Sequence, residues 1–371
     1  MLTHSFLMHG AGKMCNVNRS EVFKANEIGV YHAMNKTTRG IYLFGIDLTS
    51  ENDYRDRRGW YRDRMALLAR FFCIDVLAYS IMSNHWHAIL RNRPDLATKL
   101  TPREVAIRWL SVTSRAKCRN KNGGKITEAE IAKIVNDPEA VEERRARLSN
   151  ISWFVRQMCQ TLSRRCNKED QVTGHLFGNR FQMNRLPTEE EILAGMLYVD
   201  LNPLRAGLAD ALDDFAEVSI SERLTTLEGE AADLESWLAP LELETEVDGK
   251  QVVVANKLTA EQIEERVRKR EALSDSLGCV PMKLEAYQEL LWHLALQARP
   301  ELQATDRLPA NIFRSPLKLA GENINIDELA ERHAQMGRRY ASPVDLQTRI
   351  AIAQRQAGGG SVPIDNTWAS V

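Results

Sequence analysis

The fold of this chain is decided by one stretch of sequence, Met82-Ser83-Asn84-His85-Trp86-His87-Ala88-Ile89-Leu90. A strand-like apolar run precedes it over 72–82, and Ser83-Asn84 is a typical turn, so the segment predicts a β-hairpin. Because side chains alternate between the faces of a strand, His85 and His87 point to one side and Trp86 to the other. Two imidazoles on one face can bind a metal ion. Histidines with a purely structural role, or an unrelated zinc site, fit the pair equally well.

Two further strands and a helix are expected before this hairpin. Residues 29–34 and 41–44 have the composition of short strands. Ser50, followed by Asp53, is a plausible helix start, and apolar residues recur at helical spacing as far as Phe71.

The chain after the hairpin is expected to be mainly helical. Residues 95–150 look like an interrupted helical insertion, and 153–165 form a basic amphipathic helix. A loop at 174–181 leads into a short strand. Thr188 and Glu191 then match a capping box, which predicts the start of a helix. Asn202-Pro203 predicts its end, because a residue before proline avoids the helical region.

Tyr198 and Asn202 lie four residues apart on that last helix and therefore share a face. An amide oxygen suits a hard cation such as Mg²⁺ or Mn²⁺, and a phenol beside such an ion is a candidate nucleophile. A tyrosine packed on the sheet is the alternative interpretation. Tyr31 and Asn35 have the same spacing, but on a strand they lie roughly 13 Å apart. Tyr54 and Tyr61 are the other candidate nucleophiles.

Charge is unevenly distributed along the 371 residues, although the net charge is only −1. Residues 101–185 hold 17 Lys and Arg against 9 Asp and Glu, whereas 209–250 hold 13 acidic residues against 2 basic ones. This pattern favours a face for a polyanion followed by a separate linker, although charge used only for solubility explains it too. The six cysteines form no C-x-x-C pair. With no apolar run long enough for a bilayer and no signal-peptide pattern, we expect a cytoplasmic protein that does not bind membranes.

Four segments, taken in order, resemble the single-tyrosine HUH transposases, in particular the REP-associated tyrosine transposases and their relatives. They are Tyr31-His32-Ala33-Met34-Asn35, Met82-Ser83-Asn84-His85-Trp86-His87, Gly174-His175-Leu176-Phe177-Gly178-Asn179-Arg180-Phe181 and Tyr198-Val199-Asp200-Leu201-Asn202-Pro203-Leu204-Arg205-Ala206-Gly207. Four motifs in the same order are far more specific than any one of them. The resemblance covers roughly 25–210, and the insertion at 95–150 is longer than a compact member needs.

The resemblance implies an α+β fold, a ferredoxin-like antiparallel sheet with flanking helices, followed here by a mainly helical carboxy-terminal region. It implies cleavage of single-stranded or hairpin DNA through a 5′-phosphotyrosine intermediate, with Tyr198 as nucleophile. His85, His87 and Asn202 would hold Mg²⁺ or Mn²⁺. Some relatives carry Gln where this chain has Asn202; both supply an amide oxygen. A homodimer is also implied.

Several basic residues are candidate contacts to the DNA backbone. They are Arg156, Arg164, Arg165, Lys168, Arg180, Arg185 and Arg205. A solvated charged face is the alternative for this set. Phe177 and Phe181 can stack on bases, but the interior of the protein is the more common place for such residues.

The expected domain organisation has five parts. They are an irregular segment at 1–24, the HUH domain at 25–210, an acidic linker at 211–256, a helical region of unknown role at 257–356, including helices at 259–277 and 284–297, and a disordered tail at 357–371. Two other functions remain open: a DNA-hairpin-binding regulator of the same fold that does not cut, and an unrelated His-x-His metallohydrolase that uses zinc.

Overall fold

The computed structural model describes most of the central part of the chain. The described residues are 22–47, 50–113, 126–227, 237–239, 241, 280, 282–304, 318–319 and 322–340. The helix predicted at 259–277, the tail at 357–371 and almost all of the segment at 1–24 lie outside them.

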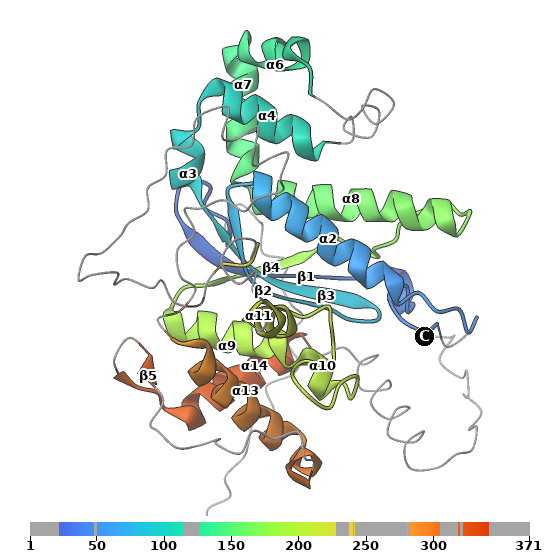
Figure 1. The fold of residues 1–371 in the computed structure, drawn as a ribbon, viewed down its shortest axis with the longest axis vertical. Helices are drawn as coiled ribbons and strands as arrows, with labels where there is room; N and C mark the ends of the chain where they lie inside the picture. Colours follow the sequence, from blue (N-terminus) through green and yellow to red (C-terminus); the bar gives the residue numbers. More distant parts are fainter. Residues whose placement is uncertain are drawn as a thin grey trace, which may run out of the picture.

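A four-stranded antiparallel sheet forms the centre of the molecule (Figure 1). Its strands are β1 (Gly29–Lys36), β2 (Ile74–Ile81), β3 (His85–Asn92) and β4 (Gln182–Leu186). They lie in the order β2-β3-β1-β4. The predicted hairpin is confirmed, since β2 pairs with β3 across the Ser83-Asn84 turn. Together with the helices on both sides, the sheet makes this a mixed α/β protein.

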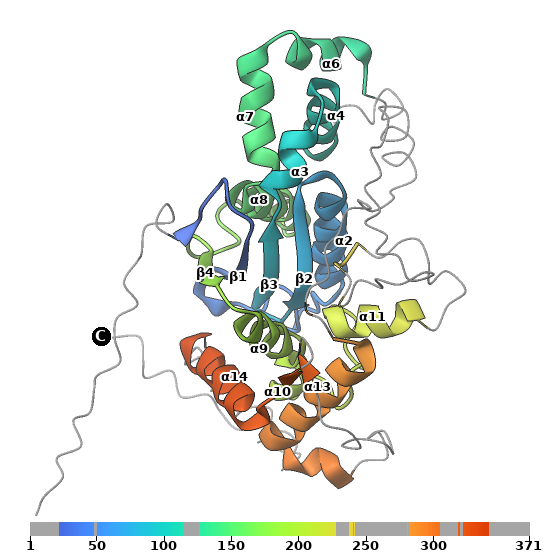
Figure 2. The same cartoon turned by 90° about the vertical axis from the view of Figure 1, so that its left-hand side faces the viewer.

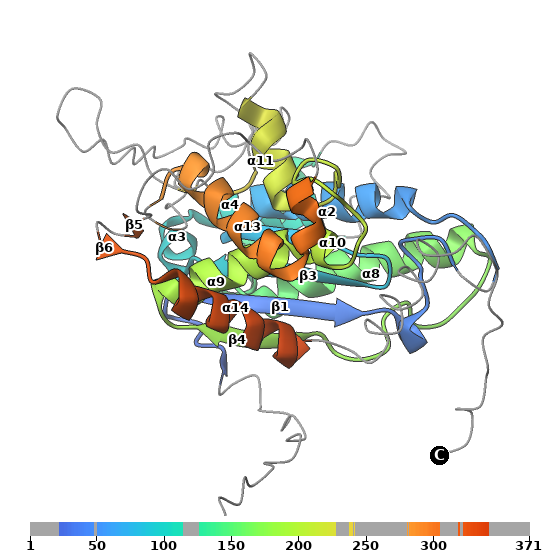
Figure 3. The same cartoon turned by 90° about the horizontal axis from the view of Figure 1, so that it is seen from below.

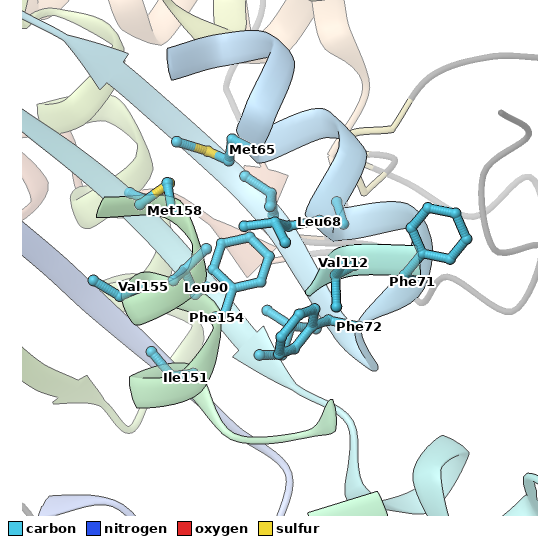
Figure 4. Close-up of a cluster of buried hydrophobic side chains, with 14 of the residues drawn as sticks. Met65, Leu68, Phe71, Phe72, Leu90, Val112, Ile151, Phe154, Val155 and Met158 are labelled. Atoms are coloured by element: carbon cyan, nitrogen blue, oxygen red, sulfur yellow. The ribbon is translucent and has the colours of Figure 1, made fainter. Parts of the chain in front are cut away.

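Two long helices cover one face of the sheet, α2 (Asp56–Phe71) and α8 (Ile151–Glu169). Their apolar side chains interdigitate with those of β3 in a single cluster, where Met65 and Leu68 from α2 meet Phe154 and Met158 from α8 (Figure 4). Leu90 of β3 lies beneath them. The alternation predicted for the hairpin is therefore confirmed on this face, to which Trp86, Ala88 and Leu90 all contribute.

The opposite face is covered by helices from the second half of the chain (Figures 2 and 3). They are α9 (Glu189–Asp200), α10 (Asn202–Arg205), α11 (Ser219–Leu227), α13 (Leu284–Ala298) and α14 (Ile326–Tyr340). Shorter elements accompany them: the 3-10 helix η3 (Pro300–Ala304) and the two-residue strands β5 (Lys318–Leu319) and β6 (Glu322–Asn323). The carboxy-terminal region thus forms a second core with the sheet.

The insertion between β3 and α8 is helical and interrupted, as predicted. It consists of α3 (Pro94–Lys99), α4 (Pro102–Val112), α6 (Glu128–Val135) and α7 (Pro138–Leu148). These helices extend beyond one end of the sheet (Figure 2). Pro102 and the capping box of Thr101 explain where α4 begins, and the capping box of Thr127 explains where α6 begins.

Two predictions before the hairpin are wrong. Ile41–Phe44 is not a strand: the chain turns there after the 3-10 helix η1 (Thr38–Gly40), where Arg39 and Gly40 both have positive φ. Of this apolar run, Phe44 is fully buried in the core, whereas Ile41 is 39% exposed. The first long helix begins at Asp56 and not at Ser50, whose hydroxyl instead bonds to Asp47 at 2.5 Å.

The acidic stretch differs from the expected linker over 211–256. Its beginning packs against the sheet, with Leu212, Phe215 and Ile220 buried in the second core. The linker was predicted from the charge of this stretch, and its apolar side chains were not considered. In the part of the chain that the structure describes, no helix is both long and apolar enough to span a bilayer.

Candidate active site

The histidine pair lies on the sheet face that α9 covers. His85 and His87 point to the same side, with ring centroids 5.0 Å apart. Both are buried: 8% of the surface of His85 and 1% of the surface of His87 is exposed. The register of β1 against β3 brings a third histidine to this face: His32 pairs with Ile89, two residues along from the Met34–His87 pair. His32 Nε2 and His87 Nδ1 are 2.9 Å apart, within a hydrogen bond.

Hydrogen bonds at Nδ1 of both imidazoles determine which ring nitrogen is left to bind a metal. His85 Nδ1 lies 2.6 Å from the side-chain oxygen of Asn84, which can only accept, so in the neutral ring Nδ1 donates and Nε2 is the unprotonated nitrogen. If His87 likewise donates from Nδ1 to His32, its Nε2 is also unprotonated. Metal-binding histidines characteristically use the second ring nitrogen in this way.

Tyr198 reaches the histidines from α9. Thr188 begins that helix as predicted, its hydroxyl accepting a hydrogen bond from the Glu191 N–H at 3.2 Å. Gly195 faces the sheet, where an added Cβ would lie 3.0 Å from Leu186 Cδ1, so the absence of a side chain lets the helix approach closely. One turn further on, the Tyr198 ring lies edge-on to His87 at a centroid distance of 5.5 Å.

A buried carboxylate fixes the end of this helix. Asp200 Oδ1 accepts hydrogen bonds from the Ser219 hydroxyl and from the Ile220 N–H at 3.0 Å. Asp200 Oδ2 accepts one from the Tyr287 hydroxyl at 2.6 Å. These bonds tie α9 to α11 and α13, so the carboxy-terminal helices determine where Tyr198 lies.

Asn202 follows α9 after one intervening residue, Leu201, and is the first residue of α10. The predicted helix end is therefore confirmed within two residues, although Pro203 begins another helical turn. Asn202 Nδ2 is buried, with no hydrogen-bond partner among the described residues. Since the nitrogen and oxygen of an amide are assigned from their hydrogen bonds, the orphaned position can equally be the oxygen. An amide oxygen without a protein donor is the group that a hard cation would use.

Two residues lie beside Tyr198 that the sequence did not predict to be part of the active site, His333 and Arg205. His333 of α14 is 6% exposed, and its ring lies 5.9 Å from that of Tyr198. The Arg205 guanidinium carbon lies 5.3 Å from the Tyr198 ring centroid; this residue was predicted only as a DNA contact. Leu329, His333 and Met336 have the spacing of one helix face, and all three are buried. This spacing is the feature of the sequence that could have indicated that His333 is buried.

The charges around Tyr198 come from cations and not from the imidazoles. Burial lowers the pKa of His87 well below its usual value, with further contributions from His85, His32 and the positive charges of Lys36 and Arg205. Burial, followed by the charge of Arg205, lowers the pKa of His333 to about 3. The two imidazoles are therefore neutral at physiological pH, the form in which imidazole binds metals, and the local potential favours an anion.

The predicted DNA-contacting residues occupy two sides of the molecule. Arg156, Arg164, Arg165 and Lys168 are exposed on α8, across the sheet from Tyr198. Arg180 is exposed in the loop after α8, and Arg185 of β4 pairs with Glu27 at 3.4 Å. Of the seven, Arg205 is the one that contacts Tyr198.

Comparisons with known proteins give little further information. No family model and no curated protein matches the chain. Among solved structures, a chain described as a REP-associated tyrosine transposase bound to a REP hairpin is 11% identical, with a TM-score of 0.32. The match covers 57% of this chain and 90% of that one. A likeness this distant does not assign a function, so the proposal below is based on the geometry of the site.

Proposed function

We propose that this chain is a transposase-like enzyme of the single-tyrosine HUH class, which cuts single-stranded DNA and transfers the strand through a phosphotyrosine. The observation that carries the proposal is the contact between Tyr198 and His87, whose rings lie 5.5 Å apart. A candidate nucleophile and a candidate metal ligand come from distant parts of the sequence, and folding brings them together at a buried position close to the positive charges of Lys36 and Arg205.

The order of elements supports this class. The chain runs β1-α2-β2-β3-α8-β4, with α3 to α7 inserted before α8, and the strand order is β2-β3-β1-β4. Both α2 and α8 pack on one face of the sheet. A ferredoxin-like sheet has this order and leaves its other face for additional elements, which here include the tyrosine helix.

The reaction follows from the positions of the side chains. The Tyr198 oxygen forms a bond to phosphorus as the bond from phosphorus to O3′ breaks. Tyr198 loses its proton and the leaving O3′ takes one up, which gives a 5′-phosphotyrosine and a free 3′-OH. Attack by another 3′-OH on the phosphotyrosine reverses these steps and joins a new strand. Arg205, whose guanidinium carbon lies 5.3 Å from the Tyr198 ring centroid, would bind the negatively charged phosphate.

The amide oxygen of Asn202 suits a hard cation, and imidazole also binds divalent metal ions. His85 and His87 present imidazoles on one face, and Asn202 has the orphaned amide position described above. These three residues would hold Mg²⁺ or Mn²⁺, with phosphate oxygens and water completing the coordination. When bound, the ion would polarise the scissile phosphodiester as a Lewis acid. Within the same proposal, His32 is a positioning residue for His87.

The role of His32 is tested by replacing it with phenylalanine, which keeps an aromatic ring but removes the hydrogen bond to His87. We expect the affinity for Mn²⁺, measured by calorimetric titration, to fall about 10- to 100-fold, as is typical when the partner of a metal-binding histidine is lost. His333→Phe is the matched control, because it removes another buried imidazole that contacts Tyr198. Equal Mn²⁺ affinity in wild type and His32→Phe would contradict this role.

The proposed function is tested by incubating the protein with labelled single-stranded hairpin DNAs from the sequences that flank its gene, with Mg²⁺ or Mn²⁺. We expect a covalent protein–DNA adduct that survives denaturation and does not form in EDTA. Hairpin binding without an adduct, for every metal and sequence tried, would favour the regulator instead.

The zinc metallohydrolase is less well supported. Catalytic zinc sites usually have three protein ligands from His, Cys, Asp and Glu. Among the described residues, no three such side chains are grouped so that they could hold a metal ion. Zinc-dependent hydrolysis without an adduct would be the result in its favour.

Tyr198 lies beside His87 of the same chain, and the proposal therefore has both residues act in cis. The homodimer and the cytoplasmic location stay predictions.

A further inference from the structure

A hollow lies on the opposite face of the sheet from Tyr198. It is a cavity of about 510 Å³ between α8 and the segment 174–181, and Asn35 at the end of β1 forms part of its lining. Its volume is in the range of about 300–1,000 Å³ that small-ligand sites usually have. The segment 174–181 is one of the four motifs, and the proposed reaction assigns it no role.

The lining combines flat apolar surface with amide groups. Trp153 is half-buried, and the guanidinium carbon of Arg156 lies 4.7 Å from its ring centroid. Phe177 and Phe181 contribute to the same wall, although both also pack in the core, as expected. Gln160 adds a side-chain amide. Aromatic rings stack on nucleobases, and amides form hydrogen bonds with base edges.

The charge at this cavity is positive. Arg156 and Arg180 line it and are exposed, and none of its lining residues is acidic. Arg164 and Lys168 continue the basic surface along α8. A flat, uncharged ring system attached to a phosphate backbone fits this combination: the ring inside the cavity and the phosphates on the arginines.

The cavity and the candidate active site lie at the same end of the sheet. Asn35 pairs with Trp86, and the adjacent Lys36 pairs with His85. Because neighbouring residues of a strand point to opposite faces, Asn35 faces the cavity while His85 faces Tyr198. The two sites thus lie on opposite faces of the sheet, near the same end of β1.

We propose that this cavity binds one unpaired base of the DNA strand that Tyr198 cuts. The inference rests on the proposed function for the identity of the strand, but the binding of a base is measurable without cleavage. A base held here would fix the register of the strand, so that one particular phosphate reaches Tyr198 and the cut falls at a defined position.

The experiment uses the full chain and single-stranded DNAs in which an abasic site is moved one position at a time. We expect a single position at which loss of the base weakens binding about 10- to 100-fold, the usual contribution of a stacked base. The fluorescent base 2-aminopurine at that position should change its emission when the protein binds. No preferred position in the abasic series would overturn the inference.

Two variants test whether the base binds in this cavity. Trp153→Ala should weaken binding by a similar factor, but Trp153 also packs against Trp109 in the core. Gln160→Glu is therefore the second variant: Gln160 is exposed, and the new charge at the cavity should repel the strand. Gln297→Glu, an exposed glutamine on α13, is the matched control. On DNA that is abasic at the preferred position, Trp153→Ala should cause no further loss.

The outcomes separate this inference from the proposed function. A preferred base position with no covalent adduct supports the cavity and counts against cleavage. An adduct with no preferred position supports cleavage and overturns the cavity. Equal effects of Gln160→Glu and Gln297→Glu would also overturn it, because the added charge would then act only through the overall charge of the protein.

Discussion

Tyr198→Phe is expected to abolish the covalent protein–DNA adduct while hairpin binding stays within about twofold. Phenylalanine lacks the oxygen that forms the bond to phosphorus, and removing a nucleophile typically lowers the rate by at least about 10⁴-fold. The ring itself is retained, and with it the contacts to His87 and His333. The measurement is a denaturing gel of labelled hairpin DNA with Mn²⁺, beside a binding titration of the same variant.

The other candidate tyrosines are the controls. Tyr31 and Tyr61 are fully buried on the sheet face away from His87. Tyr54 precedes α2, where its hydroxyl accepts a hydrogen bond from Asn52 at 3.1 Å. Tyr54→Phe should therefore form the adduct at the wild-type rate. An adduct of wild-type yield in Tyr198→Phe would show that the nucleophile is another residue.

The sequence predicted those features that depend on local pattern. Alternation along a strand places His85 and His87 together whatever the rest of the fold is. The shared face of Tyr198 and Asn202 stays a prediction, because α9 ends at Asp200 and Asn202 begins α10. The cap at Thr188 is equally local. The sequence therefore predicted the histidine hairpin and the tyrosine helix, and the structure brings them into contact.

Features that depend on contacts between distant segments could not be predicted in this way. The bond between His32 and His87 follows from the pairing of β1 with β3, and His333 reaches Tyr198 only because α14 packs on α9. The apolar run at 41–44 had a strand-like composition, but burial of Phe44 in a turn explains it equally well. Apolar composition predicts that a segment is buried. It does not predict whether the segment forms hydrogen bonds with a neighbouring strand.

Asp200→Ala should lower the free energy of unfolding by about 2–4 kcal/mol, because it leaves the buried Ile220 N–H and Tyr287 hydroxyl without their acceptor. Asp213→Ala, which removes an exposed carboxylate nearby, should change it by no more than about 0.5 kcal/mol. Urea unfolding at pH 7 measures both. Since Asp200 ends the tyrosine helix, the Ala variant should also form less adduct.

Asp200→Asn should behave differently, and its pH dependence separates the charge from the hydrogen bonds. Burial raises the pKa of Asp200 despite the hydrogen bonds from Ser219 and Tyr287, which lower it. The folded protein then holds the proton more tightly than the unfolded chain, so stability falls as the pH rises from the unfolded value through the folded pKa.

Asparagine has no such titration. Its oxygen can accept the bonds from Ser219 and Ile220, and its amide can donate to the Tyr287 oxygen. We therefore expect Asp200→Asn to be at least as stable as wild type at pH 7, to lose the part of the pH dependence due to Asp200, and to form the adduct normally. A loss as large as that of Asp200→Ala would show that the negative charge itself, and not the acceptor geometry, holds the tyrosine helix in place.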